Sequence, residues 1–181
     1  MASTPQYIKR SSETLFEIAG DVIQLLKQAH ETVSVAESLT GGGIMAALTS
    51  VPGASAVFRG GVVSYATGVK QNVLKVNGDL ITEHGVIHGD VAQQMAEGAR
   101  NITALDTATT WGISTTGVAG PDKQDGKPVG TVFIGISSAD QTQALGPFHF
   151  PGDRDRIRQA TVTEALAQLR ELLITRIKYQ E

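Results

Sequence analysis

The sequence predicts an α/β fold: a layered single domain in which helices pack on a central mixed β-sheet. Short apolar segments typical of strands alternate with segments in which apolar residues recur at helical spacing. Only residues 138–141 separate the last two predicted strands. That link is too short for a parallel crossover, so these two strands should form an antiparallel hairpin and make the sheet mixed.

The first half of the chain begins with an amphipathic helix, whose apolar face is formed by Leu15, Ile18, Ala19, Val22, Leu26 and Ala29. After it we expect a strand at 33–36, a helix at about 40–50, a strand at 61–65 and a short helix from Gly68.

The second half begins with a helix that Asp90 and Gln93 should open, and its apolar stripe comprises Val91, Met95, Ala99 and Ile102. Strands are expected at 107–116, 130–137 and 142–150. A last helix has Val162, Leu166, Leu169, Leu173 and Ile177 on one side.

Length and composition limit the function classes. A chain of 181 residues fits one domain, which we place at 13–181 after a loose polar arm over 1–12. Fifteen basic and eighteen acidic side chains give a net charge of −3 without a dense Lys/Arg cluster, which argues against a nucleic-acid partner.

The absence of cysteine excludes disulfides, a thiolate nucleophile and a Cys-type zinc site, and suits a reducing compartment. No apolar run approaches the roughly 18–20 residues that a membrane helix needs, and the first residues lack the apolar region of a signal peptide. We therefore expect a cytoplasmic protein with no membrane partner.

The most informative segment is V-S-V-A-E-S-L-T-G-G-G at 33–43, where a predicted strand ends at Ser38 and runs into a glycine loop and a helix. Free N–H groups and the positive dipole end of a helix would favour a phosphate or an oxyanion beside this serine. The alternative is structural: Ser38 or Thr40 caps the helix and the glycines form a tight turn.

Three further segments, 52–70, 115–122 and 151–158, combine small residues with polar groups as sites on loops often do. Together the chain contains six motifs in the order A-E-S-L-T-G-G (36–42), P-G-A-S (52–55), F-R-G-G-V-V-S-Y continuing to Lys70 (58–70), T-G-V-A-G-P (116–121), K-P-V-G-T-V (127–132) and G-D-R (152–154).

These motifs closely resemble those of the C-terminal domain family of the competence/damage-inducible protein CinA, over about residues 14–175. Stand-alone members of that family are nicotinamide mononucleotide deamidases. The resemblance implies an amidohydrolase of pyridine nucleotide salvage that converts nicotinamide mononucleotide to nicotinate mononucleotide and ammonia. It also implies that no cofactor is needed and that the protein forms a homo-oligomer.

The family motifs imply a catalytic pair of Ser38 as nucleophile and Lys70 as its base. Tyr65, five residues before Lys70, could orient this pair or stack on the pyridine ring, or it could be a half-buried core tyrosine. Serine hydrolysis needs a base and oxyanion donors, and a lysine serves as base when burial lowers its pKa. The sequence also suggests a substrate-binding set: Glu37, the amides of Thr40, Gly41 and Gly42, Thr116 and Gly117 from a second loop, and the phosphate-binding candidates Arg59 and Arg154.

Several alternatives remain open. Glu37 could hold Lys70 charged, bind a ribose hydroxyl, or be satisfied by nearby backbone. Arg156 and Arg158 are more typical of a charged helix face, and the segment D-K-Q-D-G-K-P at 122–128 departs from the family pattern.

His84 and His88 have an i, i+4 spacing that can bind zinc on a helix, but the Gly-Val-Ile between them argues against a helix, so we expect no metal site. Two rival functions remain: a catalytically silent nucleotide-binding or regulatory module, and an amidase for another small amide.

Overall fold

A computed structural model describes residues 12–178 and the side chains up to residue 176. The predicted polar arm lies outside the described residues except for Ser12. The strands are β1 (Val33–Glu37), β2 (Phe58–Val63), β3 (Trp111–Gly117), β4 (Thr131–Ser137) and β5 (Thr142–His149). The helices are α1 (Leu15–Ala29), α2 (Gly43–Thr49), α3 (Thr67–Asn72), α4 (Gly78–His84), α5 (Gly89–Ile102) and α6 (Arg154–Lys178), with a 3₁₀ turn η1 at Ala54–Ala56.

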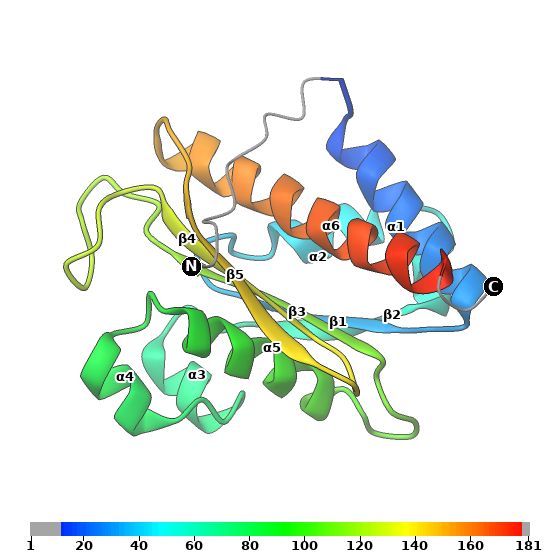
Figure 1. Cartoon of the computed structure of the whole chain (residues 1–181), viewed down its shortest axis with the longest axis horizontal. Helices are drawn as coiled ribbons and strands as arrows, with labels where there is room; N and C mark the ends of the chain where they lie inside the picture. The colour runs from blue at the N-terminus through cyan, green and yellow to red at the C-terminus, as the bar shows by residue number, and fades with distance from the viewer. Residues whose placement is uncertain (1–11, 179–181) are drawn as a thin grey trace.

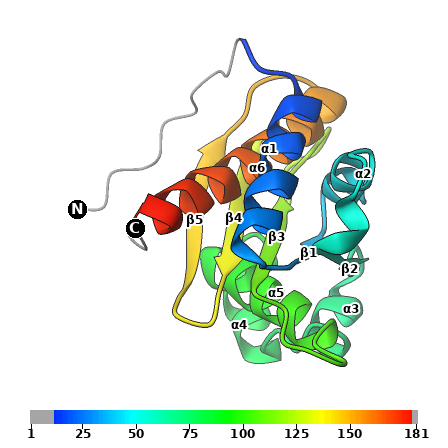
Figure 2. The ribbon, with the colours of Figure 1, turned by 90° about the vertical axis from the view of Figure 1, so that its right-hand side faces the viewer.

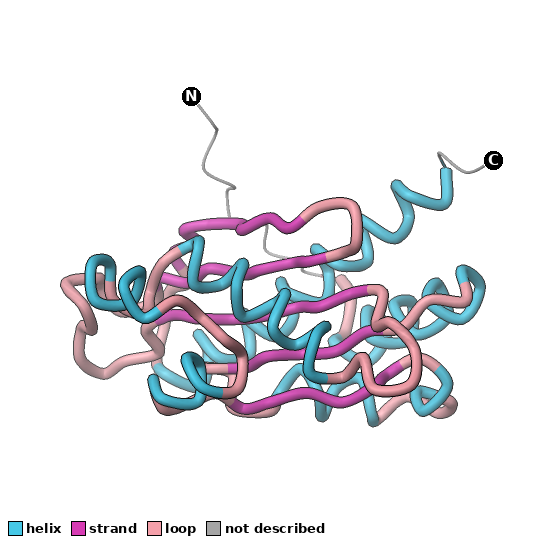
Figure 3. The backbone as a smooth tube through the Cα atoms, turned by 90° about the horizontal axis from the view of Figure 1, so that it is seen from below, coloured by secondary structure: helices cyan, strands magenta, loops and turns pink. Residues whose placement is uncertain are grey.

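The five strands lie side by side in one twisted sheet of order β2-β1-β3-β4-β5 (Figure 3). Strand β1 pairs in parallel with both β2 and β3, whereas β3, β4 and β5 are antiparallel to their neighbours. The predicted mixed sheet and its closing hairpin are therefore confirmed.

Helices cover both faces of the sheet (Figures 1 and 2). Helices α1, α2 and α6 share one apolar cluster with inward side chains such as Val35 and Ile113, while Ala36 faces the cluster that contains Met95 of α5. This alternation follows from the period of two in a strand, which sends successive side chains of β1 to opposite faces. None of the helices within residues 12–178 has the length and apolar character needed to cross a membrane.

Some element boundaries differ from those expected. Strand β2 begins three residues before the predicted 61–65, and α2 begins at Gly43 because residues 38–43 form two consecutive turns, closed by Gly41 N–H to Ser38 C=O and Gly43 N–H to Thr40 C=O. Helix α5 is capped by His88, whose Nδ1 accepts from the Asp90 N–H, and not by Asp90. Helix α4 was not expected, because none of its residues is buried and no apolar stripe marks it.

The topology directs attention to one edge of the sheet. The chain leaves β1 through α2 on one face to reach β2, and it leaves β2 through α3, α4 and α5 on the other face to reach β3. The two connections lie on opposite faces of the sheet. The C-terminal ends of β1, β2 and β3 therefore flank the crevice in which α/β folds usually bind ligands.

Candidate active site

Ser38 lies immediately beyond the C-terminal end of β1. Its N–H donates to Thr115 C=O at 3.1 Å, which continues the β1–β3 pairing by one residue, and its C=O accepts from Gly41 N–H at 3.1 Å. Gly41 and Gly42 have φ values of 59° and 100°, a left-handed conformation that glycine adopts without strain. The turn therefore fixes the serine backbone on both sides.

Lys70 approaches Ser38 from α3. Its side chain is 1% exposed, and Nζ lies 3.0 Å from Ser38 Oγ and 2.5 Å from Ser64 C=O. Ser64 is itself attached to β1, because its N–H donates to Glu37 C=O at 2.8 Å. The end of β2 thus holds the lysine nitrogen beside the serine, and the structure brings the two predicted dyad residues together.

Burial lowers the pKa of Lys70 to about 8, because an ammonium loses its hydration in this pocket. No carboxylate within residues 12–178 forms an ion pair with Lys70 that would offset this cost. Among the described residues Nζ contacts Ser38 Oγ and Ser64 C=O. Burial therefore favours the neutral amine that a general base requires.

Glu37 has a structural role in place of the expected substrate contact. Its carboxylate is fully buried and accepts from the N–H groups of Gly42, Ile44 and Met45 at 2.9–3.1 Å. The start of α2 is therefore capped by this carboxylate, not by Ser38 or Thr40, and is not free to bind a phosphate or an oxyanion. Within the described residues Glu37 also forms no hydrogen bond or ion pair with Lys70, which corrects the suggestion that it holds the lysine charged.

The expected oxyanion donors also need correction. The Gly41 and Gly42 amides are engaged, the first by Ser38 C=O and the second by Glu37. The amides of Leu39 and Thr40 have no hydrogen-bond partner within the described part of the chain, and Leu39 lines the pocket beside Ser38. Thr40 contributes no hydroxyl, since its buried Oγ1 bonds to Thr115 Oγ1 at 2.8 Å.

A pocket opens in front of the dyad, and its wall includes Tyr65 and Arg154. Arg154, from the first turn of α6, donates to Tyr65 Oη at 2.8 Å and to Gly120 C=O at 2.7 Å. Tyr65 is 60% exposed, so it is not a core residue. The structure therefore brings Ser38, Lys70, Tyr65 and Arg154 to one pocket from four separate segments.

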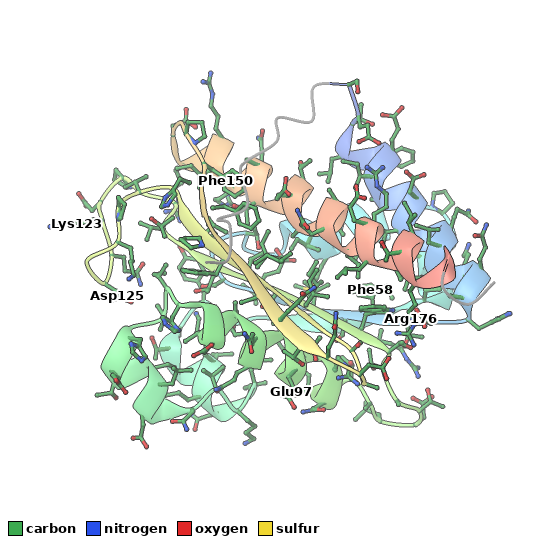
Figure 4. The ribbon with its side chains drawn as sticks, in the orientation of Figure 1. Phe58, Glu97, Lys123, Asp125, Phe150 and Arg176 are labelled. Carbon is green, nitrogen blue, oxygen red and sulfur yellow. The ribbon has the colours of Figure 1, made fainter. Side chains whose placement is uncertain are left out.

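Arg59 does not belong to this pocket. It is the second residue of β2, whereas the pocket lies beyond the C-terminal end of that strand, and its guanidinium contacts Asp106 and Thr107. In Figure 4 the neighbouring Phe58 lies toward the opposite end of the sheet from Asp125, which belongs to the loop after β3. The prediction of Arg59 as a phosphate ligand is wrong, because a residue at the start of a parallel strand lies at the end of the sheet away from the pocket.

The loop after β3 supplies pocket residues that the sequence analysis did not assign. Gly117 lines the pocket as expected, but Thr116 is buried and donates from Oγ1 to Val86 C=O at 2.6 Å, so its role is structural. Beyond the predicted set, the pocket is lined by Leu39, Thr67, Val86, Ile87, Val118, Ala119, Gly120, Asp122 and Gln124.

Asp125 anchors the same loop to the segment before α5, because its Oδ2 accepts a hydrogen bond from Val86 N–H at 2.8 Å. Asp122 and Gln124 lie in the segment 122–128 that departs from the family pattern, so motif matching gave no signal for them.

His84 and His88 stack face to face with ring centroids 4.5 Å apart, at the end of α4 and at the cap of α5. The intervening residues are not helical, as the Gly-Val-Ile sequence indicated. Within residues 12–178 no group of three or more metal-ligating side chains occurs.

The decisive comparison is with a family model, that of the CinA C-terminal domain, which matches residues 15–173. The chain belongs to the CinA C-terminal domain family. All the residues placed at the pocket above lie within the matched range.

Relatives named for CinA or for competence damage share this domain. A CinA-like protein of Frankia casuarinae is 46% identical over 156 residues, which cover 86% of this chain and 35% of the relative. A putative competence-damage inducible protein of a Geobacillus species is 46% identical over 151 residues, covering 83% of this chain and 35% of the relative. The chain thus spans about a third of the length of these curated relatives.

Solved structures of CinA superfamily proteins have the same fold. One from Escherichia coli aligns with a TM-score of 0.85 at 27% identity, covering 92% of this chain and 95% of that one. A competence/damage-inducible protein from Agrobacterium tumefaciens aligns with a TM-score of 0.78 at 32% identity, covering 97% and 98%. The layered α/β fold of this chain is therefore that of the CinA family.

Proposed function

We propose that this domain is an amidohydrolase that converts nicotinamide mononucleotide to nicotinate mononucleotide and ammonia, with Ser38 as nucleophile and Lys70 as base. The observation that supports it most directly is the 3.0 Å separation of Lys70 Nζ from Ser38 Oγ in a site where burial lowers the lysine pKa to about 8. A serine beside a neutral amine can be deprotonated as it attacks, which is the requirement for hydrolysis of an unactivated amide.

The proposed reaction has two stages. Neutral Lys70 accepts the hydroxyl proton as Ser38 Oγ bonds to the carboxamide carbon, and it then donates that proton to the departing nitrogen, which leaves as ammonia. Water next attacks the ester on Ser38 while Lys70 accepts its proton, and Lys70 returns this proton to Ser38 Oγ as nicotinate mononucleotide departs. Ser64 C=O supports this cycle by keeping one N–H of the amine occupied, so that the lone pair can face Ser38.

The Leu39 and Thr40 amides are the proposed oxyanion donors. They directly follow the nucleophile and are unpaired within the described residues. A tetrahedral intermediate needs donors that are already in place when its charge develops. In the analogous serine turn of α/β-hydrolases, the amide after the nucleophile is one of these donors.

Arg154 is the proposed phosphate ligand. It is the pocket's one arginine among the described residues, and its fork is already held by Gly120 and Tyr65 at the mouth of the site. A planar guanidinium binds a phosphate through two aligned bonds. The exposed ring of Tyr65 offers a face for the cationic pyridinium of the substrate.

The test is ammonia release from nicotinamide mononucleotide, nicotinamide riboside and nicotinamide by the purified protein. We expect turnover of the mononucleotide, loss of activity in Ser38→Ala and Lys70→Met, and unchanged activity in Lys75→Met. Lys75 is a suitable control because its Nζ bonds to Asn72 C=O outside the pocket.

Each rival has its own outcome. Binding of the mononucleotide without ammonia release would favour a silent nucleotide-binding module. Equal turnover of the riboside would argue against a phosphate site at Arg154, and turnover of another small amide in place of the mononucleotide would keep the mechanism but replace the substrate.

A further inference from the structure

Arg158, which the sequence analysis assigned to a charged helix face, contacts the turn that follows Ser38. Its Nε donates to Leu39 C=O at 3.0 Å and its Nη2 lies 3.4 Å from Thr40 C=O. Thr40 C=O also accepts from Gly43 N–H, but Arg158 is the sole donor to Leu39 C=O within the described residues. A helix that begins 116 residues after Ser38 therefore holds the backbone of the nucleophile turn.

The contact determines where an amide points. The peptide between Leu39 and Thr40 is trans, and in a trans peptide the C=O and N–H groups point in opposite directions. By fixing Leu39 C=O toward α6, the guanidinium fixes the Thr40 N–H away from α6. That N–H is one of the two unpaired amides proposed above as oxyanion donors.

The surroundings fix the guanidinium as well. Its third nitrogen, Nη1, lies 3.7 Å from Asp155 one helical turn earlier, and a Cβ at Gly41 would lie only 3.3 Å from Nη2. Arg154, four residues before Arg158, lies on the same face of α6. The first turns of α6 thus hold the phosphate side of the pocket through Arg154 and the nucleophile side through Arg158.

We infer that Arg158 is a positioning residue for the reaction: it orients the Leu39–Thr40 peptide, so that the turn presents the Thr40 N–H to the developing oxyanion. The inference rests on the proposed Ser38 chemistry. A cation bonded to a peptide C=O also polarises the group and strengthens the N–H at its other end as a donor.

The test compares Arg158→Met and Arg158→Lys with the matched control Arg156→Met. Arg156 is on the same helix, and its side chain is exposed and forms no hydrogen bond or ion pair within the described residues. Kinetics with nicotinamide mononucleotide are measured beside melting temperature. A second readout, independent of that substrate, is the rate at which a fluorophosphonate probe forms an ester on Ser38 with release of fluoride.

We expect Arg158→Met to lower kcat and the labelling rate by roughly 10- to 100-fold with KM within about threefold, because small misplacements of catalytic groups have effects of this size. Arg158→Lys should recover little, since an ammonium cannot supply the planar pair of donors. Arg156→Met should match the wild type.

Equal kcat and equal Ser38 labelling in Arg158→Met, Arg158→Lys and Arg156→Met would overturn the inference. The wild-type protein could fail to hydrolyse the mononucleotide while the Arg158 variants lose Ser38 labelling. That result would support the role of Arg158 and reject the proposed substrate. If Arg158→Met fails to fold, the test uses Arg158→Lys alone, on the condition that its melting temperature equals that of the wild type.

Discussion

The pH dependence of turnover is the sharpest consequence of the buried dyad. Burial lowers the pKa of Lys70 to about 8, so about 9% of the protein has the neutral amine at pH 7, about 50% at pH 8 and about 90% at pH 9. We expect kcat/KM to rise almost tenfold from pH 6 to 7, about fivefold from pH 7 to 8 and less than twofold from pH 8 to 9. An exposed lysine, whose pKa is about 10.4, would have roughly 0.4% as much neutral amine at pH 7.

The measurement is kcat/KM for nicotinamide mononucleotide from pH 5.5 to 10 at constant ionic strength, with the Ser38 labelling rate over the same range. The phosphate of the substrate titrates near pH 6, about two units below the expected midpoint, so the two events separate. Lys70→Arg is the control variant, because arginine retains the charge but cannot lose its proton. Its activity should fall by about 100- to 10,000-fold and the pH-dependent rise should disappear.

A profile that is flat between pH 6 and 9, or that rises with a midpoint above 10, would refute the assignment of Lys70 as a base whose pKa is lowered by burial. A rise that persists in Lys70→Arg would assign the titration to another group.

The other predictions concern stability and binding. Lys70→Met should raise the free energy of unfolding at pH 7 by about 1–2 kcal/mol, because it removes a desolvated amine at the cost of two hydrogen bonds. This gain should shrink between about pH 8 and 10.5, because over that range the unfolded wild-type chain binds more protons than the folded one and the wild type becomes more stable as the pH rises. Glu37→Gln should cost about 2–4 kcal/mol in chemical denaturation, since an amide cannot accept from all three N–H groups, whereas the exposed Glu97→Gln should cost little; equal losses would refute the cap. Arg154→Met should raise the KM for the mononucleotide about 10- to 100-fold but leave the KM for the riboside unchanged. Arg59→Met should change neither KM.

Much of the fold could be predicted from the sequence because apolar spacing reflects burial directly. The five stripe residues of α1 from Leu15 to Leu26 pack as expected, and the short link before β5 determined the antiparallel hairpin. Helix α4 escaped prediction for the same reason: none of its residues is fully buried, Leu80 and Ile81 pack only in part against the core, and the Asn77 cap defines its start.

The candidate site was predicted less evenly. The motifs identified Ser38 and Lys70, which lie 32 positions apart in sequence and come together because β1 and β2 pair in parallel. Arg59 could have been excluded from sequence alone, since it precedes the strand expected at 61–65 and so belongs to the opposite edge of a parallel sheet. Arg158 could not have been assigned, because helical spacing gives the face of a side chain but not the loop packed against it.

Glu37 shows why a residue beside the proposed nucleophile can have a purely structural role. A buried carboxylate is costly unless strong donors surround it, and the start of α2 supplies three amides that would otherwise be unpaired. Because Glu37 satisfies them, the helix end is closed to anions, and the free donors near Ser38 shift to Leu39 and Thr40. Those two amides belong to the turn that Arg158 holds from the other side, so the cap and the arginine together determine which N–H groups remain for the reaction.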